Sequence, residues 1–166
     1  MRRTYIFDTN VLFDYLVGHY AVEHGRQRLW AHARFLSTEQ RWLRFREFLR
    51  RCYPFVTVPG VLVELEYRFR HLESQRAWGH ADRTPFWRLV RRELPTSRMA
   101  EECVLLGDMA LEVLGEHGPV DAALLAVGLR YVGEHRNVAI VTEDGPLRGR
   151  CRSHEVPAVS MYELMQ

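Results

Sequence analysis

Short runs of apolar residues alternate with longer amphipathic segments along this chain. Four runs rich in β-branched or aromatic residues have the length and composition of strands, and they lie at residues 4–7, 55–58, 138–142 and 157–160. Between them, apolar residues recur at helical spacing in segments that begin near residues 9, 23, 60, 99, 120 and 147. Because strands and helices alternate, the pattern predicts an α/β fold: a three-layer α/β/α sandwich with a central parallel sheet of four to five strands.

The predicted ends of the helices depend on capping residues and on glycine. The first helix is expected to begin at Thr9 or Asn10, either of which can cap it, and to end at Gly18. Residues 23–51 carry apolar side chains at helical spacing among many arginines, which predicts one or two amphipathic helices. Residues 73–92 are polar and arginine-rich, and their pattern fits loop and helix together. We therefore expect an arginine-rich helical insertion in the fold.

The length and composition are those of one globular domain. The chain has 166 residues, of which 47% are hydrophobic and 27% charged, so residues 1–166 are expected to fold as a single domain. The first residues lack the apolar run of a signal peptide, and no stretch of about 18 apolar residues suits a membrane span. We therefore expect a cytoplasmic protein that does not engage a membrane. The three cysteines are widely spaced, with no C-x-x-C pair, and we interpret them as buried or unreactive thiols.

The net charge of +2 hides a strong asymmetry, and all 23 basic residues are arginine. Residues 24–53 hold eight arginines and two glutamates, residues 68–98 hold eight arginines and three acidic residues, and residues 99–144 hold two arginines and nine acidic residues. Arginine binds phosphate with two hydrogen bonds and stacks on bases. The two basic segments therefore form either a rim that binds the backbone of a nucleic acid or solvated helix faces. The residues that represent such a rim are Arg44, Arg50 and Arg51.

Four carboxylates are expected to meet at one edge of the predicted sheet. Asp8 and Asp144 follow strands, and open α/β sheets bind ligands at the carboxyl ends of their strands. Glu64 lies on the helix after the second strand and Asp121 in the first turn of a later helix, and both can reach that edge. A cation would relieve their mutual repulsion, and a set of oxygen ligands suits Mg²⁺ or Mn²⁺. Taken singly, each also has a structural interpretation as a helix cap, a turn residue or an exposed helix residue.

These carboxylates lie in segments that resemble the four acidic motifs of the PIN-domain ribonucleases. The segments are IFDTNVL at 6–12, VPGVLVEL at 58–65, HGPVDAALLA at 117–126 and VTEDGPL at 141–147. They follow one another in the family's order and cover most of the chain. The arginine-rich segments at 22–53 and 71–95 look longer than in compact members of the family.

The resemblance implies a metal-dependent ribonuclease that hydrolyses RNA phosphodiester bonds with a metal-activated water. It implies that Mg²⁺ or Mn²⁺ is held by the catalytic carboxylates Asp8, Glu64, Asp121 and Asp144. Asn10 would then hold Asp8, and the Thr142 hydroxyl would support Asp144. Many compact members are toxins paired with a small antitoxin, whereas others trim or degrade cellular RNA, and the motifs do not choose between these roles. A homodimer is implied in the same way.

Two other functions share part of this pattern with RNA hydrolysis. A PIN-like fold can serve as a catalytically silent RNA-binding or scaffold protein, but such proteins typically lose an acidic residue, and all four are present here. The haloacid-dehalogenase phosphatases also open with an aspartate after a strand, yet they place a second aspartate where this chain has Asn10 and use a lysine, which this chain lacks. The eight histidines form no zinc-binding pattern, and no glycine-rich phosphate loop occurs.

Overall fold

The structure, a computed structural model, describes residues 3–52, 55–95, 98, 100 and 118–166. Its elements, with 3-10 helices marked η, are in chain order β1 (Thr4–Phe7), α1 (Thr9–Glu23), η1 (Gln27–His32), α2 (Glu39–Arg51), β2 (Phe55–Val56), α3 (Gly60–Ser74), η2 (His80–Asp82), α4 (Arg83–Glu93), α6 (Pro119–Gly133), β3 (Val138–Val141), α7 (Gly145–Ser153), β4 (Ala158–Val159) and α8 (Met161–Leu164). The helix predicted over 99–114 lies almost entirely outside the described residues. No helix of the described part is long and apolar enough to cross a membrane.

The four strands of the described residues form one parallel sheet in the order β2-β1-β3-β4. β1 and β3 pair along their whole length, from Thr4 opposite Val138 to Phe7 opposite Val141. β2 and β4 are shorter than the runs that predicted them and contribute two residues each at the two edges. The α/β fold with a parallel sheet is therefore confirmed.

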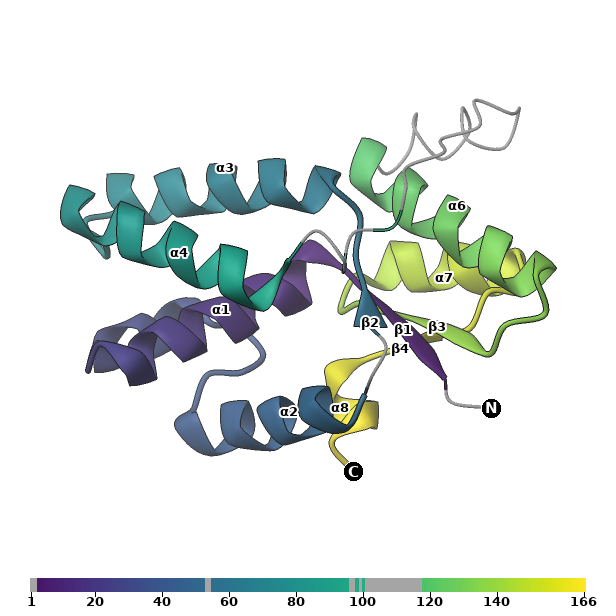
Figure 1. Cartoon of the computed structure of the whole chain (residues 1–166), viewed down its shortest axis with the longest axis horizontal. Helices are drawn as coiled ribbons and strands as arrows, with labels where there is room; N and C mark the ends of the chain where they lie inside the picture. The colour runs from purple at the N-terminus through teal and green to yellow at the C-terminus, as the bar shows by residue number, and fades with distance from the viewer. Residues whose placement is uncertain (1–2, 53–54, 96–97, 99, 101–117) are drawn as a thin grey trace.

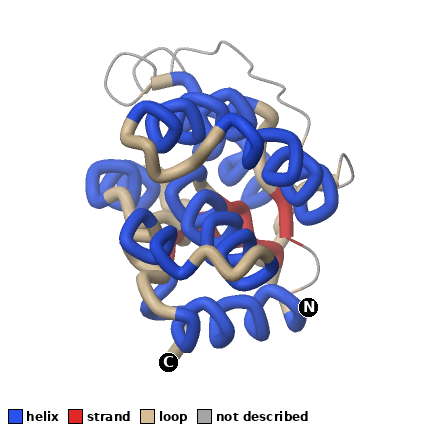
Figure 2. Tube along the Cα trace, turned by 90° about the vertical axis from the view of Figure 1, so that its left-hand side faces the viewer, coloured by secondary structure: helices blue, strands red, loops and turns tan. Residues whose placement is uncertain are grey.

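Helices surround this small sheet. In Figure 1, α6 and α7 lie above the strands and α2 and α8 below them, while α1, α3 and α4 extend together to the left beyond the sheet. In the view turned by 90°, the strands lie in the interior of the molecule with helices around them (Figure 2). Between β1 and β2 the chain forms α1, η1 and α2. The arginine-rich residues 23–51 are therefore predominantly helical, as predicted.

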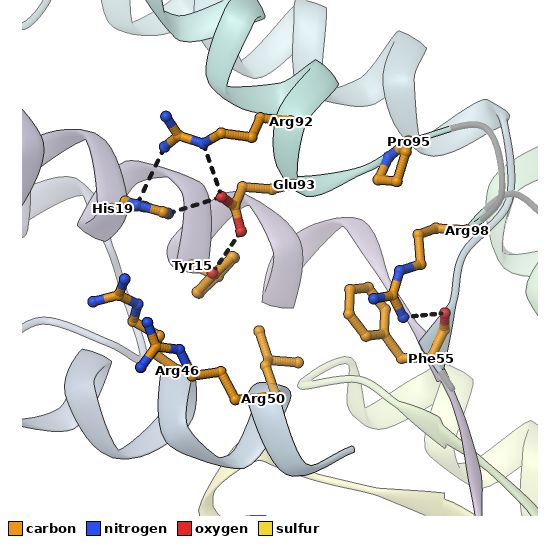
Figure 3. A pocket seen from close by; sticks show the side chains of 10 residues that line it. Tyr15, His19, Arg46, Arg50, Phe55, Arg92, Glu93, Pro95 and Arg98 are labelled. Atoms are coloured by element: carbon orange, nitrogen blue, oxygen red, sulfur yellow. Dashed lines mark hydrogen bonds and ion pairs between the residues drawn. The ribbon is translucent and has the colours of Figure 1, made fainter. Parts of the chain in front are cut away.

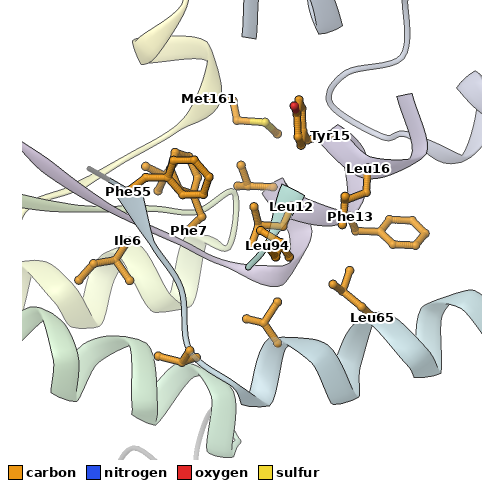
Figure 4. Packing of buried hydrophobic residues seen from close by; sticks show 14 of the residues in the cluster. Ile6, Phe7, Leu12, Phe13, Tyr15, Leu16, Phe55, Leu65, Leu94 and Met161 are labelled. Carbon is orange, nitrogen blue, oxygen red and sulfur yellow. The ribbon is translucent and has the colours of Figure 1, made fainter. Parts of the chain in front are cut away.

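The core forms where β1, the first half of α1 and α3 meet. Ile6, Phe7 and Leu12 have no exposed surface, and Figure 4 shows them converging with residues of β2, α3 and α8. The Phe7 ring packs edge-on against Phe55, with ring centroids 5.2 Å apart. Each fully buried apolar side chain of this size contributes roughly 1.5–3 kcal/mol of burial free energy. The apolar run TYIF thus anchors the strand that ends at Asp8.

Buried tryptophans anchor the two arginine-rich segments. Trp42 of α2 has no exposed surface, and its indole N–H donates to the Tyr15 carbonyl oxygen at 3.0 Å. Trp78 packs against Phe86 and Phe69, with ring centroids 4.7 and 4.9 Å apart. The aromatic residues therefore face inward, which leaves most arginines on the outer sides of their helices.

The prediction that the first helix ends at Gly18 is wrong, because α1 continues to Glu23. A Cβ atom at Gly18 would lie 2.5 Å from Trp42 Cδ1 and 2.8 Å from Trp30 Cζ3, closer than real Cβ contacts allow. The glycine therefore serves the close packing of two tryptophans against the middle of α1. A glycine inside a helical pattern has two meanings, an end or a close approach, and the local sequence is the same for both.

We predict that Gly18→Ala lowers the free energy of unfolding, measured in urea, by about 1–3 kcal/mol, because it overpacks the contact with Trp42 and Trp30. Gly149→Ala is the matched control, since Gly149 lies in α7 and an added Cβ meets nothing within 4 Å. The control should be neutral or more stable by up to about 1 kcal/mol. Equal stability of the Gly18→Ala variant and the wild type would contradict the packing explanation.

Candidate active site

The carboxyl ends of β1 and β3 bring Asp8 and Asp144 to one edge of the sheet. Asp8 follows β1 directly, and its backbone N–H donates to the Val141 carbonyl oxygen at 3.1 Å, which extends the strand pairing by one residue. β3 ends at Val141, and the chain passes through Thr142 to Asp144. The two aspartates therefore follow neighbouring strands, as the sequence predicts.

Asp8 is a buried carboxylate with a defined orientation. Asp8 is only 3% exposed. Its Oδ2 accepts hydrogen bonds from Asn10 Nδ2 and Thr142 Oγ1, both at 2.7 Å. Burial raises the pKa of Asp8 and the charge of Glu64 raises it further, whereas the Thr142 hydrogen bond and the charge of Arg68 lower it. Asn10 thus lies where the resemblance implies, against Asp8.

Thr142 connects the two aspartates in a different way from the one the resemblance implies. Its hydroxyl donates to Asp8 and accepts from the backbone N–H of Asp144 at 3.0 Å, so it does not donate to the Asp144 carboxylate. Asp144 is the N-cap of α7, and its Oδ1 accepts from the Leu147 N–H at 2.7 Å. The helix cap therefore uses one carboxylate oxygen and leaves Oδ2 outside that hydrogen bond.

Glu64 and Asp121 approach the same edge from the beginnings of α3 and α6, which pack against each other. Figure 1 shows the first turns of these helices close together, and both side chains are half-buried. The pKa of Asp121 is raised to about 7, first by burial and then by the charges of Asp8, Asp144 and Glu64. The charges of the other three predicted carboxylates all raise the pKa of Asp121, so the four residues lie within electrostatic range of one another. We call these four residues the acidic cluster.

Arg68 is a neighbour of this cluster that the sequence interpretation missed. Its Nη2 donates to Asn10 Oδ1 at 2.8 Å, and Asn10 in turn donates to Asp8. The guanidinium also lies over the Phe13 ring, with Cζ 5.4 Å from the ring centroid. Arg68 follows Glu64 by four residues on α3, so both lie on one helix face. That spacing is the one sequence signal that pointed to it.

The cluster fits a hard divalent cation by the type of its ligands. Four carboxylates offer only oxygen atoms, and the raised pKa of Asp121 shows that their negative charge is incompletely compensated. Within the described residues, however, no three His, Cys, Asp or Glu side chains are already grouped closely enough to hold an ion. The carboxylates would therefore have to rotate toward one another to share one, with Asp8 the most firmly oriented of them.

Cys151 is buried and Cys52 is half-buried, which agrees for these two with their interpretation as buried or unreactive thiols. Burial raises the pKa of Cys151 to about 12, and the charge of Asp121 adds to this effect. Burial also raises the pKa of Cys52 to about 11. Both side chains therefore remain protonated near neutral pH, while Cys103 lies outside the described residues.

The three representative arginines of α2 do not share one surface. Arg44 and Arg51, seven residues apart, border the same shallow hollow, and Arg51 is paired with Glu47 at 2.9 Å. Arg50 lines a separate pocket on another side of the helix. Because successive residues of a helix are about 100° apart, Arg50 and Arg51 point in different directions. Arg44, Arg50 and Arg51 therefore do not form a single rim.

A basic groove includes the chain neighbour of one cluster carboxylate in its lining. It has a volume of about 600 Å³, includes Glu143, the neighbour of Asp144, and its basic and aromatic lining residues are Arg34, Phe35, Arg41, Arg44 and Tyr162. Tyr162 is 70% exposed. Buried Asp14 holds the loop that carries two of these residues, because its Oδ2 accepts from the Phe35 N–H at 2.5 Å. Glu143 is occupied by the Met161 N–H, which donates to its Oε1 at 2.6 Å.

Comparison with protein-family models, with curated proteins and with solved structures finds no match for this chain. The chemistry of the acidic cluster therefore rests on its own residues.

We predict that Asp121→Asn changes how the stability of the metal-free protein depends on pH. Wild-type Asp121 keeps its proton up to about pH 7 when folded but loses it near pH 3.8 when unfolded. Between these values the folded state binds more protons, so stability falls as pH rises. In EDTA, the variant should match the wild type near pH 3.8 and melt at a higher temperature above about pH 7.

The control for this measurement is Glu155→Gln, which removes a charge from an exposed position. It should leave the pH profile of the melting temperature unchanged. If Asp121→Asn melts lower than the wild type above pH 7, the carboxylate stabilises the fold and is not part of a repulsive cluster.

Proposed function

We propose that this protein is a metal-dependent ribonuclease with a PIN-like three-layer α/β/α arrangement. Its metal site would consist of Asp8, Glu64, Asp121 and Asp144, with Mg²⁺ or Mn²⁺ as the cation. The observation that carries the proposal is the convergence of four chain segments: Asp8 and Asp144 follow the paired strands β1 and β3, and Glu64 and Asp121 lie near the beginnings of the packed helices α3 and α6. The pKa of Asp121, raised to about 7, agrees with this arrangement. Residues from two strand ends and two helices converge there, which four unrelated caps and turns would not explain.

The four carboxylates differ in how firmly hydrogen bonds hold their side chains. Asp8 is held in place by Asn10 and Thr142, so it can present a fixed ligand direction without reordering. Asp144 is tied to α7 by one oxygen only. Glu64 and Asp121 extend from the helices α3 and α6, and their side chains can rotate toward a cation bound by Asp8 and Asp144. A bound Mg²⁺ or Mn²⁺ would supply an activated water and would stabilise the charge that develops on a phosphodiester.

Arg68 has a positioning role in this proposal. It binds the amide oxygen of Asn10, which orients the amide nitrogen toward Asp8. Its positive charge also favours the ionised form of Asp8, because it lowers the pKa that burial raises. The pair therefore keeps Asp8 both oriented and charged.

The basic groove supports RNA as the substrate. Arg41 and Arg44 are exposed on α2, and neither has a carboxylate partner among the described residues. Arg34 stacks on Phe35, with Cζ 5.2 Å from the ring centroid, and Tyr162 offers an exposed ring nearby. Cationic side chains interleaved with aromatic rings bind single strands through phosphates and stacked bases. Glu143, which precedes Asp144 in the chain, lines the groove as well and connects it to the loop that carries that carboxylate.

We predict that the purified protein cleaves single-stranded RNA in the presence of Mg²⁺ or Mn²⁺ and that EDTA abolishes the cleavage. Asp8→Asn should lower the rate by roughly a thousandfold or more, because cation stabilisation of the transition state is worth several kcal/mol. The rate is measured on a fluorescently labelled oligoribonucleotide.

The matched control is again Glu155→Gln, which should cleave at the wild-type rate. Circular dichroism of Asp8→Asn checks that the variant is folded. Full activity in EDTA would contradict the metal mechanism. Tight RNA binding without cleavage in any divalent cation would instead favour the silent RNA-binding alternative.

We predict that Arg41→Gln together with Arg44→Gln weakens RNA binding and makes it less sensitive to salt. Each lost phosphate contact should reduce the slope of log affinity against log salt by about 0.7 on single strands. Binding is measured by fluorescence anisotropy at several salt concentrations. Arg88→Gln with Arg91→Gln, two exposed residues of α4 outside the groove, is the control. An unchanged slope in the Arg41 and Arg44 variant would remove the groove from the RNA path.

A further inference from the structure

A second basic site lies on the other side of α2 from the basic groove. We call it the arginine pocket: a cavity of about 330 Å³ lined by Tyr15, His19, Arg46, Leu49, Arg50, Phe55, Arg92, Glu93, Pro95 and Arg98. Figure 3 shows the arginines around its opening and Tyr15 and Glu93 between them. None of the four carboxylates of the acidic cluster lines it. It is therefore separate from the candidate active site.

The arginine pocket carries an excess of positive charge. Four arginines line it, against the single carboxylate of Glu93. Arg92 is neutralised in part, because it binds Glu93 at 3.2 Å and Glu23 outside the pocket at 2.9 Å. Arg46 and Arg50, in contrast, have no carboxylate partner among the described residues. Two uncompensated guanidinium groups on one wall of a small cavity favour an anion.

Hydrogen bonds orient much of the pocket before any ligand binds. The Tyr15 hydroxyl donates to Glu93 Oε2 at 2.8 Å, and Arg92 donates to the other carboxylate oxygen. Opposite them, the Arg98 guanidinium lies over the Phe55 ring, with Cζ 4.1 Å from the centroid, and Nη1 donates to the Phe55 carbonyl oxygen at 3.4 Å. Arginine side chains fixed in this way lose less conformational entropy when they bind a ligand.

The positive field reaches the neighbouring titratable groups. Burial lowers the pKa of His19, Glu93 opposes this, and Arg92 and Arg46 lower it further. Burial and Glu93 raise the pKa of Tyr15, whereas Arg46 and Arg50 act in the opposite direction. Arg46 and Arg50 therefore both lie within electrostatic reach of the Tyr15 hydroxyl, across the cavity from α4.

The geometry points to a binding site for a phosphate monoester in the arginine pocket. A monoester carries nearly two negative charges and three terminal oxygens near neutral pH, which suits guanidinium groups that approach from several walls. The volume lies at the lower end of the range for small-molecule sites, so it admits a phosphate with one attached nucleoside. Leu49 and Pro95 supply an apolar surface for that group.

The same chemistry has two sources, a free mononucleotide or the 5′-phosphate of an RNA strand. Both present one terminal phosphate next to a sugar and a base. A phosphodiester inside a strand carries one charge and is flanked on both sides, so it matches the small cavity and its excess of positive charge less well. This site does not depend on the proposed hydrolysis, because its binding can be measured in EDTA.

The test compares three probes by isothermal titration calorimetry in EDTA: adenosine 5′-monophosphate, 3′,5′-cyclic adenosine monophosphate and adenosine. The monoester should bind tightest, the cyclic diester more weakly, and adenosine without detectable heat. Arg46→Gln with Arg50→Gln should weaken binding of the monoester about tenfold for each arginine, the usual value of a charged hydrogen bond. The matched control, Arg88→Gln with Arg91→Gln, removes the same charge from exposed positions of α4 and should bind as the wild type does.

Arg50→Gln alone provides a second variant, because Arg50 is exposed and its replacement does not disturb the stacking of Arg46 on Trp42. It should lose about tenfold in affinity with an unchanged melting temperature. Equal binding of the monophosphate and adenosine, or unchanged affinity in both pocket variants, would overturn the proposal.

Competition distinguishes the two sources of the phosphate. A short single-stranded RNA with a 5′-phosphate should displace the mononucleotide if the site receives RNA ends, whereas the same RNA with a 5′-hydroxyl should not. If neither RNA competes while the mononucleotide binds, the ligand is a free nucleotide, and the phosphate monoester site stands in both cases.

Discussion

The parallel pairing of β1 with β3 is the interaction on which the arrangement of the site depends. The register sets Phe7 opposite Val141, so the chain leaves both strands at the same level of the sheet. Asp8 and Thr142 are then adjacent, and the hydroxyl of Thr142 can bind the Asp8 carboxylate and the Asp144 backbone together. A shift of one residue in this register would turn Asp8 toward the other face of the sheet and break both hydrogen bonds. Burial of β3 on all four of its residues opposes such a shift.

The pairing of β1 with β3 places negative charge at a buried edge of the sheet, where water cannot solvate it well. Asp8 is buried, Asp121 is half-buried, and the charges of Asp144 and Glu64 add to the rise in the pKa of Asp121. Arg68 compensates only part of this charge, and it reaches Asp8 through Asn10 rather than by a direct ion pair. Such a cluster costs stability unless a cation or a proton joins it.

The positive charge of the chain is divided among surfaces with different surroundings. On one side of α2, arginines and aromatic rings line the basic groove, which also includes Glu143. On another side, Arg46 and Arg50 enter a smaller pocket whose other arginines are held by Glu93 and the Phe55 ring. An arginine-rich helix can therefore serve two anion-binding surfaces, because its side chains leave in all directions around its axis. The tryptophan and phenylalanine residues of the same segments hold these surfaces in place.

The four strands and most of the described helices could be predicted from the sequence, because alternation and helical spacing are local patterns, whereas the short helix α8 was not predicted. The placement of Asp8 and Asp144 after strands followed from the same patterns and from the common edge of parallel strands. Gly18 was misread, because its role depends on Trp42, which lies 24 residues away in the chain but contacts α1 in the fold. The partner of the Thr142 hydroxyl and the contact of Arg68 with Asn10 were likewise decided by tertiary structure. Hydrogen bonds between distant segments depend on ångström-scale distances, which spacing along the chain does not encode. Only the folded chain therefore determined which residues hold the carboxylates and which surfaces the arginines line.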